Sequence, residues 1–278
     1  MARIKNDRFL MSEKFFSIQC EGKTTGYPAY FLRLTNCNLV CGCSPSYVNQ
    51  MKKGEIEHDP GSFVGDLQLA GNATWVCDTI PVWIKGAEIQ FQQIINDWKT
   101  EGVYDDITKG LIHLIWTGGE PTIQQESIVN FEKYWQLEAN KTNNGTNRVF
   151  HEIETNGTLY IDDELFNLLD QINCSPKLAN SGQLKQMRIV PKAIQRIMEH
   201  PNYQFKFVIS TEDDVFEMFD TYINEFKIPL QNVCCMPGLD SQDQFHERTR
   251  FILEMAKKYK FIGLTRLHVS AWNKTTGV

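Results

Sequence analysis

The sequence lacks the features that mark nucleic-acid-binding and membrane proteins. Lys and Arg number 28 against 34 Asp and Glu, which gives a formal net charge of −6. No run of basic residues is present that would attract a phosphate backbone. The longest apolar runs are far shorter than the roughly 20 residues that a membrane-spanning helix needs. We therefore expect no nucleic-acid partner and no membrane partner.

Residues 1–7 contain no apolar stretch, so we expect no signal peptide in this segment. We therefore expect a cytoplasmic protein, in which the eight cysteines serve as ligands or buried thiols rather than disulfides. No internal repeat divides the chain, and 42% of its residues are hydrophobic. Residues 1–278 are expected to form one domain with a sizeable core.

Short apolar segments alternate with longer helical patterns, which is typical of βα units on a parallel sheet. The expected strands are residues 29–35, 111–116, 148–154, 204–210, 232–236 and 261–269. The expected helices are residues 123–139, 162–171, 213–225 and 242–259, the last with Phe245, Thr249, Ile252 and Ala256 on its inward face. The pattern predicts a barrel-like α/β fold.

Residues 43–74 do not follow this rhythm. They carry Gly54, Gly61, Gly65 and Gly71 together with two prolines, Pro45 and Pro60. Long loops inside a compact domain are often functional. The plain alternative is a solvated excursion without chemistry, and we interpret the segment as such a loop insertion.

Three cysteines form the most specific chemical pattern of the chain. Cys37 and Cys41 stand in one short segment, and Cys77 opens the tripeptide Cys-Asp-Thr. Three thiolates suggest an iron–sulfur cluster, in which one of four irons stays free to bind a small molecule. Thiolates also bind zinc, and Cys43 offers a fourth sulfur for a structural zinc site. We favour the cluster, while the spacing alone leaves both metals open.

Polar residues and glycines follow the expected strands. Residues 117–121 are Thr-Gly-Gly-Glu-Pro, Glu154 opens the segment Glu-Thr-Asn-Gly-Thr, and Ser175 precedes Pro-Lys. Each segment alone is compatible with a turn. Because the carboxyl ends of parallel strands meet at one edge of a sheet, together they predict a functional site there.

In this order, the segments resemble the radical S-adenosylmethionine enzymes and, among them, the 7-carboxy-7-deazaguanine synthase family. Residues 16–22 look like the family's Gln-Gly-Glu-Gly loop, and residues 26–34 resemble the strand after it. The cysteine motif, residues 117–121, 153–158 and 175–178, and Arg266-Leu267-His268 follow in family order. The resemblance spans nearly the whole chain apart from the insertion. It implies a partial, modified (β/α) barrel and a homodimer.

The resemblance implies a [4Fe–4S] cluster whose fourth iron binds the amine and carboxylate of S-adenosylmethionine. The protein would hold the sulfonium bond beside the substrate and exclude water and oxygen from the resulting radical. The implied cluster ligands are Cys37, Cys41 and Cys77, and the implied S-adenosylmethionine contacts are Gly118, Gly119, Glu120 and Ser175.

A pterin substrate and Mg²⁺ are implied as well. The edge of a flat pterin needs hydrogen-bond donors and acceptors, and its carboxylate suits the planar guanidinium of Arg33. Thr79 resembles the family's magnesium contact, although Asp78-Thr79 is also a common type of turn cap. The implied substrate contacts are Gln19, Glu21, Arg33, Thr117, Glu154 and His268.

The chain departs from the family pattern in two places. The insertion separates Cys41 from Cys77 and makes Cys43 a rival ligand, with Trp75 and Asp78-Thr79 favouring Cys77. Cys20 stands where the family has a glycine, which puts the close backbone approach that glycine permits in question.

The activity implied is the radical conversion of 6-carboxy-5,6,7,8-tetrahydropterin to 7-carboxy-7-deazaguanine with loss of ammonia, in queuosine and deazapurine biosynthesis. An electron donor such as flavodoxin would serve it. One alternative is another radical S-adenosylmethionine enzyme such as a glycyl-radical activase, which needs a protein partner. The other is a zinc-stabilised binding module without catalysis.

Overall fold

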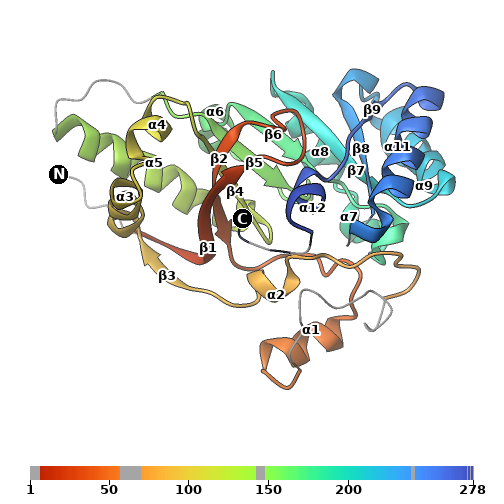
Figure 1. Ribbon diagram of the computed structural model, residues 1–278, viewed down its shortest axis with the longest axis horizontal. Coiled ribbons are helices and arrows are strands. Elements are labelled where there is room, and N and C mark those ends of the chain that lie inside the picture. Colours follow the sequence, from red (N-terminus) through yellow and green to blue (C-terminus); the bar gives the residue numbers. More distant parts are fainter. Residues whose placement is uncertain are drawn as a thin grey trace.

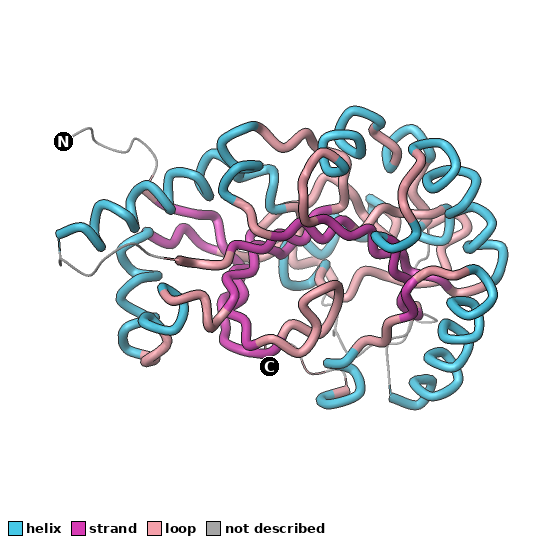
Figure 2. The backbone as a smooth tube through the Cα atoms, turned by 90° about the horizontal axis from the view of Figure 1, so that it is seen from above, coloured by secondary structure: helices cyan, strands magenta, loops and turns pink. Residues whose placement is uncertain are grey.

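The computed structural model describes residues 7–56, 70–141, 148–238, 242–273, 275 and 277. Within these residues the strands form one nine-stranded sheet in the order β3-β1-β2-β4-β5-β6-β7-β8-β9. Strand β1 is antiparallel to both of its neighbours, and every pair from β2 to β9 is parallel. Figure 2 shows the strands as an open arc with helices along its outer side.

The strands include all six that the sequence predicts, with shifted ends. Their bounds are β1 Arg8–Ile18, β2 Pro28–Leu34, β3 Ala87–Gln90, β4 His113–Gly118, β5 His151–Thr155, β6 Gln171–Cys174, β7 Tyr203–Ile209, β8 Val233–Pro237 and β9 Ile262–Gly263. The expected strand at 261–269 was wrong beyond its first residues, because β9 ends at Gly263 and helix α12 begins at Leu267.

The helices surround the sheet on its outer side and also extend below it (Figure 1). Their bounds are α1 Pro45–Lys52, α2 Ile80–Trp83, α3 Phe91–Thr100, α4 Tyr104–Thr108, α5 Gln125–Lys141, α6 Asp163–Leu168, α7 Lys185–Arg188, α8 Pro191–Met198, α9 Glu212–Met218, α10 Asn224–Phe226, α11 Phe245–Tyr259 and α12 Leu267–Trp272. The four expected helices are confirmed as α5, α6, α9 with α10, and α11. No helix in the described ranges is long and apolar enough to cross a membrane.

Alternation along the strands separates the core from the interior of the arc. In β7, Phe205, Phe207 and Ile209 are buried in the main core against the helices, while Lys206 and Val208 face a cavity on the other side. Successive side chains of a strand point to opposite faces, so one strand serves both surfaces. The cavity-facing positions of β2, β4, β5 and β8 include Phe31, Arg33, Thr117, Glu154 and Met236.

The insertion at 43–74 begins as a packed helix, so its interpretation as a plain solvated loop was wrong for this part. The Ser44 hydroxyl caps α1 by accepting a hydrogen bond from the backbone N–H of Tyr47 at 3.2 Å, and Pro45 occupies the first turn, where no N–H partner is required. Figure 1 shows α1 projecting beyond α2. The buried members of the small second core beneath it are Cys43, Val48, Met51, Ile80 and Trp83.

Backbone hydrogen bonds bring the far end of the insertion back to its beginning. The N–H of Ala70 donates to the carbonyl of Gly42 at 2.9 Å, and the N–H of Cys77 donates to the carbonyl of Cys41 at 3.1 Å. These bonds fix Cys77 beside Cys41, although the insertion separates them in sequence. Gly42 sits at φ +86°, with the backbone of Trp75 against it.

The close approach at Gly42 predicts a difference between two glycine substitutions. Gly42→Ala and Gly54→Ala should each cost about 1–2 kcal/mol of unfolding free energy, because both residues have positive φ. Only at Gly42 would the new Cβ lie 2.2 Å from the Trp75 carbonyl oxygen, whereas Gly54 has open space. Overpacking should add about 1–3 kcal/mol for Gly42→Ala. Denaturant unfolding measures both, and equal losses would contradict the close packing.

Candidate active site

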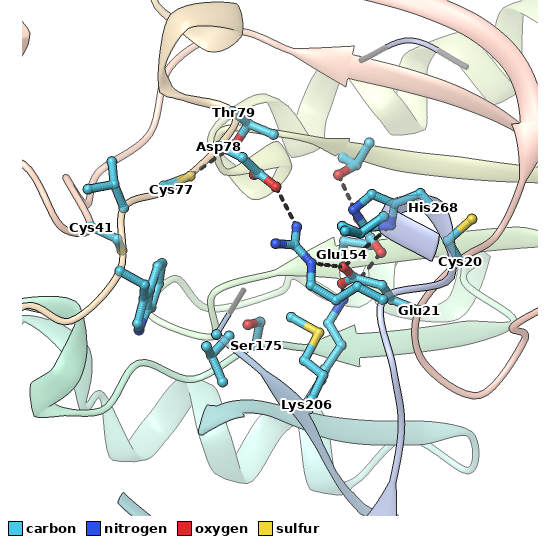
Figure 3. Close-up of a pocket in the computed structure, with 18 of the residues that line it drawn as sticks. Cys20, Glu21, Cys41, Cys77, Asp78, Thr79, Glu154, Ser175, Lys206 and His268 are labelled. Carbon is cyan, nitrogen blue, oxygen red and sulfur yellow. Dashed lines mark hydrogen bonds and ion pairs between the residues drawn. The ribbon is translucent and has the colours of Figure 1, made fainter. Parts of the chain in front are cut away.

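A cavity of about 670 Å³ opens at the carboxyl ends of the parallel strands. Its wall includes Thr117 and Gly118 at the end of β4, Ser175 after β6 and Ser210 after β7. All of the site residues expected from the sequence line this cavity except Glu120. Figure 3 shows Cys41 and Cys77 on one side and Glu21, Glu154, Lys206 and His268 on the other.

The three expected cluster ligands lie at the same end of the cavity. Burial raises the pKa of the Cys37 thiol to about 12 and moves those of Cys41 and Cys77 above their usual range. Because metal ligands must be thiolates, a bound positive centre has to offset this cost. The Cys77 sulfur also lies 3.0 Å from the hydroxyl of Thr79.

Cys43, the rival ligand, lies in a different environment. Its side chain is buried in the second core and does not line the cavity. No three His, Cys, Asp or Glu side chains of the described chain converge closely enough to hold a single metal ion. A four-iron cube needs a wider separation of its sulfurs than a single ion does.

The paired glycines of the Thr-Gly-Gly-Glu-Pro segment allow one backbone to press against another. The N–H of Gly119 donates to the Leu34 carbonyl at 3.1 Å. A Cβ at Gly118 would lie 2.2 Å from that oxygen, and a Cβ at Gly119 would lie 1.9 Å from the Asn36 carbonyl oxygen. The glycines therefore set the position of the turn that leads into Cys37, in addition to lining the cavity.

Glu120 is buried behind the cavity wall and holds the loops after β4 and β5 together. Its carboxylate accepts hydrogen bonds from the Thr122 hydroxyl at 2.6 Å, the Thr155 hydroxyl at 2.8 Å and the Asn156 N–H at 2.7 Å. Direct contact with the methionyl amine stays a prediction, since these bonds occupy most of its acceptor capacity.

A continuous series of opposite charges crosses the cavity from the cysteine loop to β5. We call Asp78, Arg266, Glu21, Lys206 and Glu154, in this order of contact, the charge chain. Arg266 pairs with Asp78 and, through Nε, with Glu21 at 3.1 Å. Lys206 Nζ lies 2.6 Å from Glu21 Oε2 and 3.5 Å from Glu154 Oε1. The charge chain joins segments that are distant in sequence.

The neighbouring charges keep Glu21 and Lys206 ionised. Burial alone would raise the pKa of Glu21, but Lys206 and Arg266 hold that pKa well below its usual range. Burial would likewise lower the pKa of Lys206, but Glu21 and Glu154 hold it above its usual range. Glu154 also accepts a hydrogen bond from the Thr117 hydroxyl at 2.8 Å.

His268 faces the charge chain from α12. Its Nδ1 lies 3.9 Å from Glu21 Oε1. Burial and the neighbouring Arg266 lower the pKa of His268 below its usual value. A neutral imidazole at neutral pH can donate from one ring nitrogen and accept at the other.

Gln19 is almost fully buried and orients the loop that carries Glu21. Its amide nitrogen donates to Glu152 Oε1 at 2.9 Å, and its amide oxygen accepts from the Glu21 N–H at 3.1 Å. Both halves of the amide therefore have protein partners. A direct contact between Gln19 and substrate stays a prediction.

Arg33 and Ser175 also line the cavity with partners of their own. Arg33 donates to Glu13 at 2.6 Å, and its guanidinium lies 5.1 Å from the centre of the Phe15 ring. Ser175 accepts a hydrogen bond from Lys177 Nζ at 2.9 Å.

Sequence reasoning missed the cations of the charge chain. Lys206 had a signal, because it is the single charged residue of an otherwise apolar or amide-bearing strand, Tyr203–Ile209, at an inward position. Arg266 was noted only as part of a motif, without a role. Asp78 was considered only together with Thr79, as support for Cys77 and as an alternative turn cap. What these residues share is that each forms an ion pair within the charge chain. Such pairs join residues that are distant in sequence and become visible only in the folded structure.

Three comparisons bear on the family. No family model matches the chain. The chain is 27% identical over 275 residues to the 7-carboxy-7-deazaguanine synthase of Pyrobaculum aerophilum, covering 97% of both chains. It is 24% identical over 284 residues to the synthase of Halobacterium salinarum, covering 95% of this chain and 90% of that one. The chain is a homologue of the 7-carboxy-7-deazaguanine synthases.

A solved structure supports the fold. The crystal structure of QueE from Escherichia coli aligns with a TM-score of 0.56 at 19% identity, covering 94% of this chain and 95% of that chain. The partial, modified barrel expected from the sequence is therefore confirmed. The resemblance expected from the sequence is confirmed by the curated synthases, to which the chain is similar over at least 95% of its length.

The environment of Glu120 predicts a loss of stability on neutralisation. In Glu120→Gln, one carboxylate oxygen is replaced by an amide NH₂, which cannot accept a hydrogen bond from the hydroxyl and N–H donors that surround it. The unfolding free energy should therefore fall by about 1–3 kcal/mol. Glu126→Gln, an exposed position in α5, should change it by less than about 0.5 kcal/mol. Chemical unfolding of the cluster-free variants measures both. Equal stability of Glu120→Gln and the wild type would contradict the network.

Proposed function

We propose that this chain is a 7-carboxy-7-deazaguanine synthase, which converts 6-carboxy-5,6,7,8-tetrahydropterin to 7-carboxy-7-deazaguanine with loss of ammonia, in queuosine and deazapurine biosynthesis. One observation carries the proposal: a single cavity has three cysteines at one end and Glu21, Lys206 and Glu154 of the charge chain at the other. The end-to-end similarity to curated synthases favours this activity over the glycyl-radical activase and the zinc module.

We propose that Cys37, Cys41 and Cys77 hold a [4Fe–4S] cluster. The fit rests on three thiols that share one cavity wall, with Lys177 nearby to offset negative charge. When bound, the cluster supplies the electron that cleaves S-adenosylmethionine and so starts hydrogen abstraction at C6 of the pterin. Gly118, Gly119 and Glu120 for the methionyl group, and Ser175 for the ribose, are the proposed S-adenosylmethionine contacts.

The opposite end of the cavity suits a flat heterocycle. Glu21 and Glu154 are carboxylate acceptors for the N–H groups of a pterin edge, and Thr117 and His268 add hydroxyl and imidazole groups. Arg33 supplies a guanidinium for the substrate carboxylate. Gln19 is proposed as a further edge contact. Substrate that fills the cavity would displace water from the reacting atoms.

Mg²⁺ is proposed to bind at Thr79. A hydroxyl oxygen is a hard ligand of the kind that Mg²⁺ prefers, and Mg²⁺ usually keeps several waters and shares its shell with substrate. Thr79 lines the cavity beside Asp78, and its hydroxyl lies 3.0 Å from the Cys77 sulfur (Figure 3).

We propose further that the chain works as one domain in a cytoplasmic homodimer that receives electrons from a flavodoxin-type donor. All strands of the described chain, from β1 to β9, belong to one sheet, which supports a single domain. The cysteines are free thiols, as a reducing compartment favours. The donor and the dimer rest on the resemblance to the family.

The direct test is turnover by the anaerobically reconstituted protein. With S-adenosylmethionine, a chemical reductant, Mg²⁺ and 6-carboxytetrahydropterin, the product should be 7-carboxy-7-deazaguanine together with 5′-deoxyadenosine. A parallel reaction in chelator should be slower if the magnesium site is correct. Formation of 5′-deoxyadenosine without any conversion of the pterin would remove the proposed substrate.

The position of the thiols predicts which cysteine the cluster needs. Cys77→Ala should abolish the visible absorption of the cluster and the cleavage of S-adenosylmethionine, because it removes a cavity-lining sulfur. Cys43→Ala removes a sulfur of the second core and should leave iron and sulfide content close to wild type. Iron and sulfide analysis of both variants decides. The opposite outcome would assign the third ligand to Cys43.

A further inference from the structure

Lys206 is a buried cation between two carboxylates of the cavity. It extends from the inward face of β7, and only 5% of its side chain is exposed. Its ammonium lies 2.6 Å from Glu21 Oε2 and 3.5 Å from Glu154 Oε1. Lys206 itself lines the cavity together with both partners.

The remaining partners of the two carboxylates leave acceptor capacity facing the cavity. Glu21 Oε1 accepts from Arg266 Nε at 3.1 Å, with His268 Nδ1 3.9 Å away. Glu154 Oε2 accepts from the Thr117 hydroxyl, and Gln19 Nε2 lies 3.5 Å from Glu154 Oε1. Each carboxylate oxygen can accept two hydrogen bonds. A ligand that offers N–H donors would complete both groups.

Two carboxylates that face one cavity repel each other unless a cation lies between them. Without the Lys206 ammonium, Glu21 would keep Arg266, but Glu154 would keep only neutral donors. The two groups would then separate, or one would take up a proton and present an O–H donor in place of an acceptor. Either change alters which heterocycle edge the cavity recognises.

We infer that Lys206 is a positioning residue that fixes Glu21 and Glu154 as a pair of anionic acceptors and thereby selects a heterocycle edge of adjacent N–H donors. The 2-amino-4-oxo edge of a pterin offers such donors, whereas the 2,4-dioxo edge of a lumazine places a carbonyl oxygen where the pterin has its amino group. This inference rests on the proposed function, because it concerns the substrate of that same cavity.

The test compares two stable probes, pterin-6-carboxylate and lumazine-6-carboxylate, by calorimetry on cluster-reconstituted protein with S-adenosylmethionine under anaerobic conditions. The wild type should prefer the pterin. Lys206→Met should reduce the ratio of the two dissociation constants by at least about tenfold, since a mismatched polar group governs such discrimination. S-adenosylmethionine affinity should stay at the wild-type value. In turnover, KM for the tetrahydropterin should rise more than kcat falls.

Two further variants separate selectivity from stability. Lys206→Gln keeps a hydrogen-bond donor but not the charge, and it should show the same loss of preference for the pterin. It replaces Lys206→Met in the test if Lys206→Met does not fold. Lys258→Met removes an ammonium that pairs with Glu212 at 2.6 Å on the surface, away from the cavity, and should leave the probe ratio unchanged.

The outcomes distinguish this inference from the proposed function. A wild type that does not convert the tetrahydropterin removes the proposed function. If the wild type converts the tetrahydropterin and a folded Lys206→Met or Lys206→Gln variant keeps the wild-type ratio of the two dissociation constants, the proposed role of Lys206 is wrong. Failure of both neutral variants to fold would assign Lys206 to stability alone and would also overturn it.

Discussion

The ion pair between Glu21 and Lys206 is the contact on which the arrangement of the cavity depends. Lys206 connects Glu21 with Glu154, and Arg266 connects Glu21 with Asp78 beside Cys77. A buried ion pair adds little net stability because desolvation offsets attraction, but it is costly to break. The charge chain therefore acts mainly as a geometric constraint: it fixes the substrate-side carboxylates relative to the loop that carries the third cysteine.

The cysteine end is fixed by backbone instead of charge. The Cys41 carbonyl accepts from the Cys77 N–H, and the glycines at 42, 118 and 119 let neighbouring strands and turns come into direct backbone contact. This arrangement explains how the chain accommodates an insertion between Cys41 and Cys77. In the described parts of the insertion, Ala70 returns to Gly42 through a backbone hydrogen bond, and α1 buries its apolar face in the second core.

Much of the parallel sheet could be predicted, because its strands are apolar runs with period-two alternation and its long helices have clear apolar faces. The misses have physical reasons. Strand β1 carries charged residues such as Glu13 and Lys14, which pair with Arg33 and Asp97, so it has no apolar run. Helix α3 was also missed, although its buried residues stand at helical spacing: Phe91, Ile94, Ile95 and Trp98. The insertion before it interrupts the alternation of strands and helices along the chain.

For the site, motif order predicted which residues share the cavity but not what holds them there. Glu120 and Gln19 illustrate the limit: their residue types suit ligand contact, yet their polar groups are directed to Thr122, Asn156 and Glu152. Lys206 lies 185 residues from its partner Glu21 in the sequence, and Arg266 lies 245 residues from it. Ion pairs over such separations leave no local pattern in the sequence. A charged residue on the inward face of an apolar strand shows only that a partner must exist, because an unpaired buried charge is too costly to keep. The partner's identity follows from the curvature of the open sheet, which brings the N-terminal loop, β7 and the segment before α12 to one place.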